Sequence, residues 1–146
     1  MMRICRYAIY DVMKLVLDTN VLVAGVRSRT GASNLVLIAG FEGRFDWMCS
    51  VPVFYEYEEV LGRAEFLLET GLDRTTISRF LDAVARIVVP VDIEFQWRPQ
   101  LRDPKDEMVL EAAVNSGAGA IVTHNLRDFG QVPRRFGVDV QSPGET

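Results

Sequence analysis

The 146-residue sequence is poor in the residues that build disulfide-rich and zinc-binding proteins. It contains two cysteines, Cys5 and Cys49, and a single histidine, His124. Two cysteines are too few for a disulfide framework, so the expected setting is the cytoplasm, with both thiols free. Together with one histidine they cannot complete a tetrahedral zinc site.

Positive charge and long apolar runs are also missing. The formal net charge is −4, which excludes nucleic-acid binding by bulk charge and requires any such activity to come from a local site. No apolar run approaches the roughly 18 residues of a membrane-spanning helix, so no membrane partner is expected. The sequence has no GxxxxGK[ST] phosphate-binding loop, no GxSxG nucleophile elbow and no internal repeat.

What remains is the composition of one globular domain, with 49% hydrophobic and 25% charged residues. We expect the domain to span residues 13–142, because Met13 stands directly before the first strand pattern. Residues 1–12 are then an N-terminal extension, with a short ordered lead-in as the alternative. They lack the continuous apolar core of a signal peptide. Residues 143–146 are expected to be a frayed tail.

Apolar runs alternate with amphipathic segments along the chain. The runs predict strands at 15–17, 45–49, 88–93, 120–123 and 138–140. Capping residues, prolines and glycines predict helices at about 21–27, 33–41, 50–63, 73–87 and 103–117. Strands separated by helices indicate a three-layer α/β/α sandwich with a central, mainly parallel sheet.

Polar side chains follow two of these strands. Asp18 stands at the carboxyl end of the first strand, and Asn125 and Asp128 follow the end of the fourth. Sites in open parallel sheets form beyond the carboxyl ends of the strands, so these residues are candidates for a site. The alternative for Asp18 is that it only caps the following helix.

The predicted helix at 103–117 carries an acid on its apolar face. Asp106 projects into the middle of that face, where an unpaired carboxylate is costly unless it is hydrogen-bonded or binds a metal. Helix capping is the alternative, with Asp103 at the N-cap and Asp106 in the first turn. Glu107 and Glu111 lie toward the polar side and are predicted to be solvated.

The predicted helix at 50–63 offers two further acids at the edge of its apolar stripe. Glu56 and Glu58 flank that stripe on opposite sides, and helical spacing does not choose between them, whereas Glu59 is expected on the surface. Three separate segments therefore each offer an acid near the core. Such carboxylates suit Mg²⁺, which activates water and stabilises charge on a phosphodiester.

Four motifs in order carry a resemblance to a known family. They are LVLDTNVLVAG (15–25), SVPVFYEYEEVLGR (50–63), RDPKDEMVLEAAVNSGA (102–118) and AIVTHNLRDF (120–129). Together they resemble the PIN-domain nucleases, and in particular the VapC-like toxins of type II toxin–antitoxin systems. The resemblance spans about residues 13–140.

The resemblance implies roles for individual residues. Asp18, Glu56 and Asp106 match the catalytic acids, and it is the resemblance that selects Glu56 over Glu58. Asp18, Asp106 and Asp103 match the metal ligands, Asp103 being an extra acid before proline in this branch. The supporting residues are Asn20, Asn125 and Asp128. Asn125 departs from the family, because many relatives carry an acid there, and its neutral amide favours one tightly held ion over two.

The resemblance also implies the activity and the partners. It implies an Mg²⁺- or Mn²⁺-dependent endoribonuclease that cleaves single-stranded RNA, a cognate antitoxin and a homodimer. The Asn125 departure motivates an alternative, a catalytically weak or inactive PIN-like module that binds RNA or protein. A metal-dependent phosphatase is a weaker alternative, because Asp18-Thr19-Asn20 lacks the second aspartate of aspartyl-phosphate enzymes.

Overall fold

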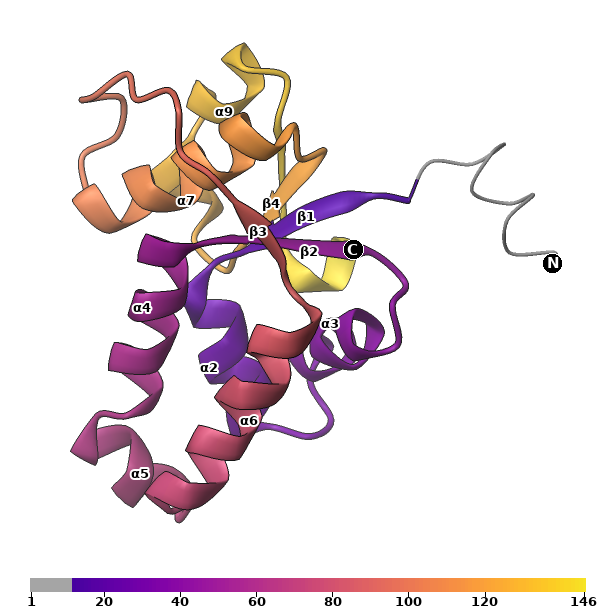
Figure 1. Ribbon diagram of the computed structural model, residues 1–146, viewed down its shortest axis with the longest axis vertical. Coiled ribbons are helices and arrows are strands. Elements are labelled where there is room, and N and C mark those ends of the chain that lie inside the picture. The colour runs from indigo at the N-terminus through magenta and orange to yellow at the C-terminus, as the bar shows by residue number, and fades with distance from the viewer. Residues whose placement is uncertain (1–11) are drawn as a thin grey trace, which may run out of the picture.

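The computed structural model describes residues 12–146 as an open sheet of five parallel strands (Figure 1). The strand order is β3-β2-β1-β4-β5. The strands are β1 (Lys14–Leu17), β2 (Asp46–Ser50), β3 (Val89–Val91), β4 (Ala120–Val122) and β5 (Asp139–Gln141). The predicted parallel α/β/α fold is confirmed.

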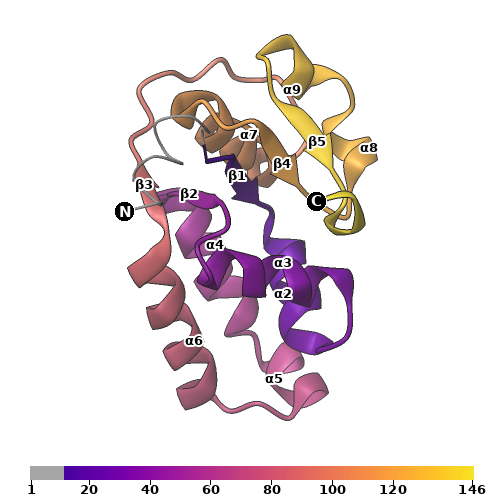
Figure 2. The same ribbon diagram turned by 90° about the vertical axis from the view of Figure 1, so that its right-hand side faces the viewer.

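Helices cover both faces of the sheet. The helices are α2 (Thr19–Arg27), α3 (Ala32–Phe41), α4 (Val51–Leu61), α5 (Ala64–Thr70), α6 (Arg74–Ile87), α7 (Pro104–Ser116), α8 (Leu126–Phe129) and α9 (Val132–Arg135). Figures 1 and 2 show α2, α3, α4 and α6 on one side of the sheet and α7 and α9 on the other. The chain therefore changes face between β3 and α7.

Side-chain caps fix where several helices begin. The Asp18 carboxylate accepts from the Thr19 amide, Ser50 accepts from the Val53 amide at the start of α4, and Asp73 accepts from the Thr76 amide at the start of α6. Each cap satisfies a backbone donor that has no partner inside its helix. The sequence predicted the cap at Ser50 and offered either Asp73 or Thr75 as the cap of α6, of which the structure uses Asp73. Most element bounds agree within two residues.

The core lies between the sheet and its two helix layers. Leu15, Val16 and Leu17 of β1 are buried on both faces, as are Ala120, Ile121 and Val122 of β4. Uniformly apolar strands of this kind are typical of a parallel sheet covered on both sides. Cys49 is buried in the same core, which raises the pKa of its thiol to about 12 and makes it a poor nucleophile.

The C-terminal residues differ from the predicted frayed tail. Pro143–Glu145 form a short 3-10 helix with Pro143 buried. The Ser142 amide donates to the Glu145 carboxylate in a capping box, which holds the segment in place. The predicted N-terminal extension, except Val12, lies outside the described residues. Within 12–146, no helix has both the length and the apolar character needed to cross a bilayer.

Candidate active site

The candidate site lies where the direction of the sheet connections reverses. The chain leaves β1 toward β2 on one side, and it later returns to add β4 on the other side of β1. The carboxyl ends of β1 and β4 flank the crevice that this reversal opens, which is where ligands bind in open α/β sheets. A pocket of about 240 Å³ opens there between α2, α4 and α7. Its walls include Asp18, Asn20, Glu56, Lys105 and Asn125.

Asp18 stands at the floor of this pocket and is 9% exposed. Its Oδ1 accepts from the Thr19 amide at 2.8 Å. Its Oδ2 accepts from the Thr123 hydroxyl at 2.8 Å and from the Asn20 amide at 3.3 Å. Burial raises the pKa of Asp18, and the Glu56 and Asp128 charges raise it further against these hydrogen bonds. The residue caps α2 and also lines the pocket, so the structural and functional interpretations are compatible.

Glu56 and Glu58 point to different places, although they are two residues apart on α4. Glu56 lines the pocket with a side chain that is 13% exposed, and its Oε1 lies 3.4 Å from Lys105 Nζ. Glu58 is exposed and lies beside a separate groove between α4 and α6. Glu59 is exposed as predicted and pairs with Arg63. Of the two acids that helical spacing left open, the tertiary structure brings Glu56 to the pocket.

Asp106 lies half-buried in the first turn of α7, and it does not itself line the pocket, although Lys105, next to it in the sequence, does. Desolvation raises its pKa to about 6, with further contributions from the charges of Asp18, Asp103 and Asp128. No capping box forms at Asp106, because Asp103 alone caps α7 by accepting from the Lys105 amide at 2.9 Å. Acids at the end of β1, at the start of α7 and in α8 thus repel one another.

Asn20 and Thr123 form the polar frame of the site. Asn20 donates to the Thr123 hydroxyl at 3.3 Å and accepts from the His124 amide at 3.2 Å. The Thr123 hydroxyl also accepts from the Asn125 amide at 3.0 Å. These bonds join the end of β1 to the end of β4 and fix Asp18 between them. The sequence did not indicate Thr123, since a threonine at the end of a strand has no distinctive pattern.

His124 is an exposed residue of the same loop. Its Nε2 lies 2.7 Å from the buried Ser33 hydroxyl of α3. The contact connects the loop after β4 to the helix layer that contains α2, α3, α4 and α6. It supports a positioning role for the histidine and not a zinc-binding one.

The donors at the pocket match the chemistry of a hard divalent cation. Carboxylate and amide oxygens are the ligands that Mg²⁺ prefers, and mutual repulsion of the acids is the electrostatic condition that a cation relieves. Thr19 also lines the pocket, and its hydroxyl is buried without a hydrogen-bond partner. Among residues 12–146, however, no three carboxylate, histidine or cysteine groups are arranged to hold an ion. Binding would therefore require the side chains to move together.

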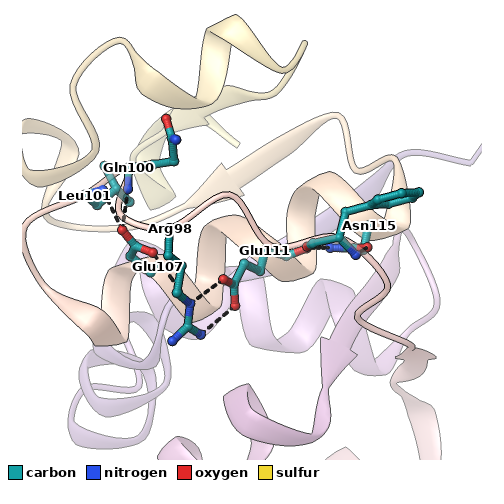
Figure 3. A network of polar contacts seen from close by, with 7 residues as sticks. Arg98, Gln100, Leu101, Glu107, Glu111 and Asn115 are labelled. Atoms are coloured by element: carbon teal, nitrogen blue, oxygen red, sulfur yellow. Dashed lines mark hydrogen bonds and ion pairs between the residues drawn. The ribbon is translucent and has the colours of Figure 1, made fainter.

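On another face of α7, two acids that the sequence predicted to be solvated are buried. Glu107 and Glu111 are 4% and 8% exposed, not solvated. Glu107 Oε1 accepts from the Gln100 and Leu101 amides at 2.5 and 2.8 Å, and Arg98 donates two bonds to Glu111 at 2.6 and 2.8 Å (Figure 3). We call Glu107, Glu111 and Asn115, with the segment 94–101 that they hold, the α7 clamp.

The α7 clamp accounts for the burial of these acids. The Asn115 side chain accepts from the Glu94 and Phe95 amides, both at 2.9 Å. The three clamp residues of α7 are spaced by four, so they form one stripe along the helix. The segment that they hold runs along α7 and leads into Asp103. No local pattern in residues 94–101 indicates the clamp, because the segment has no regular secondary structure.

The fold and the pocket define a class of protein, the parallel α/β/α domains with an acidic crevice at the switch point of the sheet. Comparison with protein families shows which family within this class the chain belongs to. Residues 14–127 match the PIN domain family. The match covers well over half of the chain, and the chain belongs to this family.

Solved structures of the same fold include a bacterial complex. Ten chains of solved structures match. One is from the crystal structure of VapBC2 from Rickettsia felis bound to a DNA fragment from their promoter. It is 14% identical with a TM-score of 0.63, and the match covers 89% of this chain and 98% of that chain. At this identity the likeness shows the fold. The curated proteins contain no match to this chain.

Proposed function

We propose that this protein is an Mg²⁺- or Mn²⁺-dependent endoribonuclease that hydrolyses single-stranded RNA. The observation that carries the proposal is the set of acids at one crevice. Asp18 at the end of β1 and Glu56 of α4 line the pocket, and the Asp18 charge helps to raise the pKa of Asp106 in α7, while burial raises the pKa of both aspartates. Acids held together against repulsion are typical of a cation site that acts on phosphate esters.

The chain's own residues prepare the site. Thr123 and Asn20 fix the Asp18 carboxylate, and the N-terminal turn of α7 presents Asp106 beside it. Asp18 and Asp106, with Asp103, would hold the cation, and Asn20, Asn125 and Asp128 would assist. A bound cation would supply an activated water and neutralise charge on the phosphodiester. Water adds to phosphorus and the bond to the 3′ oxygen breaks, leaving a 5′-phosphate and a 3′-hydroxyl.

Glu56 and Glu58 provide a matched pair of variants for the first test. Both are glutamates of α4, but only Glu56 lines the pocket. We expect Glu56→Gln to lower the rate of cleavage of a labelled single-stranded RNA in Mg²⁺ or Mn²⁺ by about 100-fold or more, because Glu56 would act within the site. Glu58→Gln should cleave at the wild-type rate.

Two further outcomes belong to the same experiment. EDTA, Asp18→Ala and Asp106→Ala should each abolish cleavage. Cleavage that survives these changes would contradict the proposal, as would a folded, metal-binding wild-type protein that leaves varied RNAs intact. A parallel assay on single-stranded DNA tests the choice of RNA.

We further propose that the protein is the toxin of a toxin–antitoxin pair, acts in the cytoplasm and forms a homodimer. The four motifs and the likeness in fold to a chain of VapBC2 support the pairing with an antitoxin. Expression should arrest growth, and Asp18→Ala should abolish the arrest. Co-expression of a small overlapping neighbouring frame should restore growth, and a lack of arrest by the wild type would contradict the toxin role.

One observation favours a second candidate, a PIN-like module that binds RNA or protein with little or no turnover. The pocket carries the neutral Asn125 where many relatives carry an acid. RNA binding that persists in EDTA without any cleavage would favour this candidate. Asn125→Asp should then increase cleavage if the missing acid limits activity.

A further inference from the structure

We propose that Lys105 binds a phosphate of the RNA substrate and exchanges its present partner, Glu56, for that phosphate. The inference rests on the proposed function and adds a substrate-binding residue to it. Its basis is the position of a single ammonium group on the wall of an otherwise acidic or neutral pocket.

Among residues 12–146, Lys105 is the only cationic residue that lines the pocket. It is also one of two lysines in the sequence, and the other, Lys14, begins β1 at the opposite end of that strand. An anionic polymer that enters the pocket meets Asp18 and Glu56, with Asp106 close by. The Lys105 ammonium is therefore the one side chain of the wall that attracts a phosphate.

Its place in α7 is electrostatically unfavourable for a structural residue. Lys105 is the second residue of the helix, where the partial positive charge of the helix terminus favours acids over bases. Two nearby acids follow that preference: Asp103, the N-cap, and Asp106, the residue directly after Lys105. A lysine here costs helix stability, a cost that a role in binding an anion explains.

The contact that Lys105 makes is suited to exchange. Its Nζ lies 3.4 Å from Glu56 Oε1, an ion-pair distance outside the range of a strong charge-assisted hydrogen bond, and its side chain is half-exposed. The lysine end of the pair is half-exposed, so the Lys105 ammonium can move from Glu56 toward an incoming phosphate without first leaving a buried position. If Glu56 turns toward a cation in the pocket, Lys105 loses its partner at the step when a phosphate needs one.

The salt dependence of RNA binding tests the inference, with fluorescence anisotropy of a labelled single-stranded RNA as the readout. Measurements are made in CaCl₂, with gel analysis to show that the RNA stays intact. Each phosphate neutralised by a side chain contributes about 0.7 to the slope of log K against log salt concentration for a single strand. We expect Lys105→Met to lower this slope by about 0.7, and Lys105→Arg to restore it.

The matched control removes another cation that pairs with a glutamate of α4. Arg63 Nη2 lies 3.1 Å from Glu59 Oε1, and Arg63 does not line the pocket. Arg63→Met should leave the slope unchanged. Steady-state cleavage provides a second readout, in which Lys105→Met should raise KM and leave kcat near the wild-type value.

The outcomes separate the two proposals. If the wild type binds and cleaves RNA but Lys105→Met keeps the full slope, Lys105 is only the partner of Glu56 and this inference is wrong. An equal loss of slope in Arg63→Met would overturn it too, since the effect would be one of overall charge. If the wild type neither binds nor cleaves RNA, the proposed function fails and takes this inference with it. Thermal melting of each variant shows that it is folded.

Discussion

Two consecutive carboxylates of α7, Asp106 and Glu107, point about 100° apart around the helix and have opposite surroundings. Glu107 is the more buried, yet two backbone amides donate to it and Arg98 lies 3.6 Å away. Asp106 is less buried, yet its pKa rises to about 6 because it is desolvated among other acids. Burial alone therefore does not mark a functional acid.

The difference lies in what surrounds each charge. The α7 clamp surrounds its acids with donors of this chain, so their charges are satisfied within the folded protein. Asp106 is instead desolvated among the like charges of Asp18, Asp103 and Asp128, which leaves its charge to be satisfied from outside. One helix thus carries a structural acidic face and a face whose electrostatics favour a cation.

Addition of a cation should give the largest difference between variants of the two faces of α7. At about 100 times its dissociation constant, Mg²⁺ or Mn²⁺ should stabilise the wild type by about 3 kcal/mol, because it binds only the folded state. Asp106→Asn should abolish this shift, measured as Tm with and without the ion. Glu107→Gln should keep it. Equal Tm shifts in both variants would show that the two faces of α7 do not differ in cation binding.

Loss of the ion pair in the α7 clamp should have the next largest effect. Glu111→Ala removes both acceptors of the half-exposed Arg98 guanidinium, and we expect it to lower the free energy of unfolding by about 2 kcal/mol. Glu59→Ala, which breaks the exposed pair with Arg63, should change it by less than about 0.5 kcal/mol. Urea denaturation measures both. A loss no larger in Glu111→Ala than in Glu59→Ala would show that the clamp is not stabilising.

Removing the unsatisfied charge should have the smallest effect, and the opposite sign. The folded protein holds the proton of Asp106 more tightly than the unfolded chain, so ionisation destabilises the fold as pH rises from about 4 through about 6. In EDTA at pH 8, Asp106→Asn should raise the free energy of unfolding by about 1 kcal/mol, allowing for solvent screening. The gain should disappear below about pH 4. A gain independent of pH would show that repulsion is not its cause.

The sequence predicted the strands and the longer helices because their signals are local. Ser50 before Pro52 is a cap that a reader of the sequence can find, and Asp73 is one of the two caps, with Thr75, that the sequence offers for α6. The short helix α5 was missed because its N-cap, Arg63, provides no side-chain cap and coincides with the predicted end of the preceding helix at residue 63. The helices α8 and α9 have four residues each, too few to show a period.

The candidate site was predictable residue by residue only in part. Asp18 at the end of a strand and Asp106 on an apolar helix face are visible in the sequence. The choice of Glu56 over Glu58 depended on a resemblance, and the pocket supports it independently. Glu107 and Glu111 were assigned to solvent because helical spacing gives the direction of a side chain but not what covers it.

By itself, the sequence determined the alternation of strand and helix, the parallel sheet and which acids follow its strands, because these depend on spacing and on caps a few residues away. Only the tertiary structure decided which acids have partners. The partners of Glu107 and Glu111 come from a segment without regular structure, and those of Asp18 and Glu56 come from other elements of the fold. A charge is satisfied or left open by what is close in space, and no local pattern encodes that.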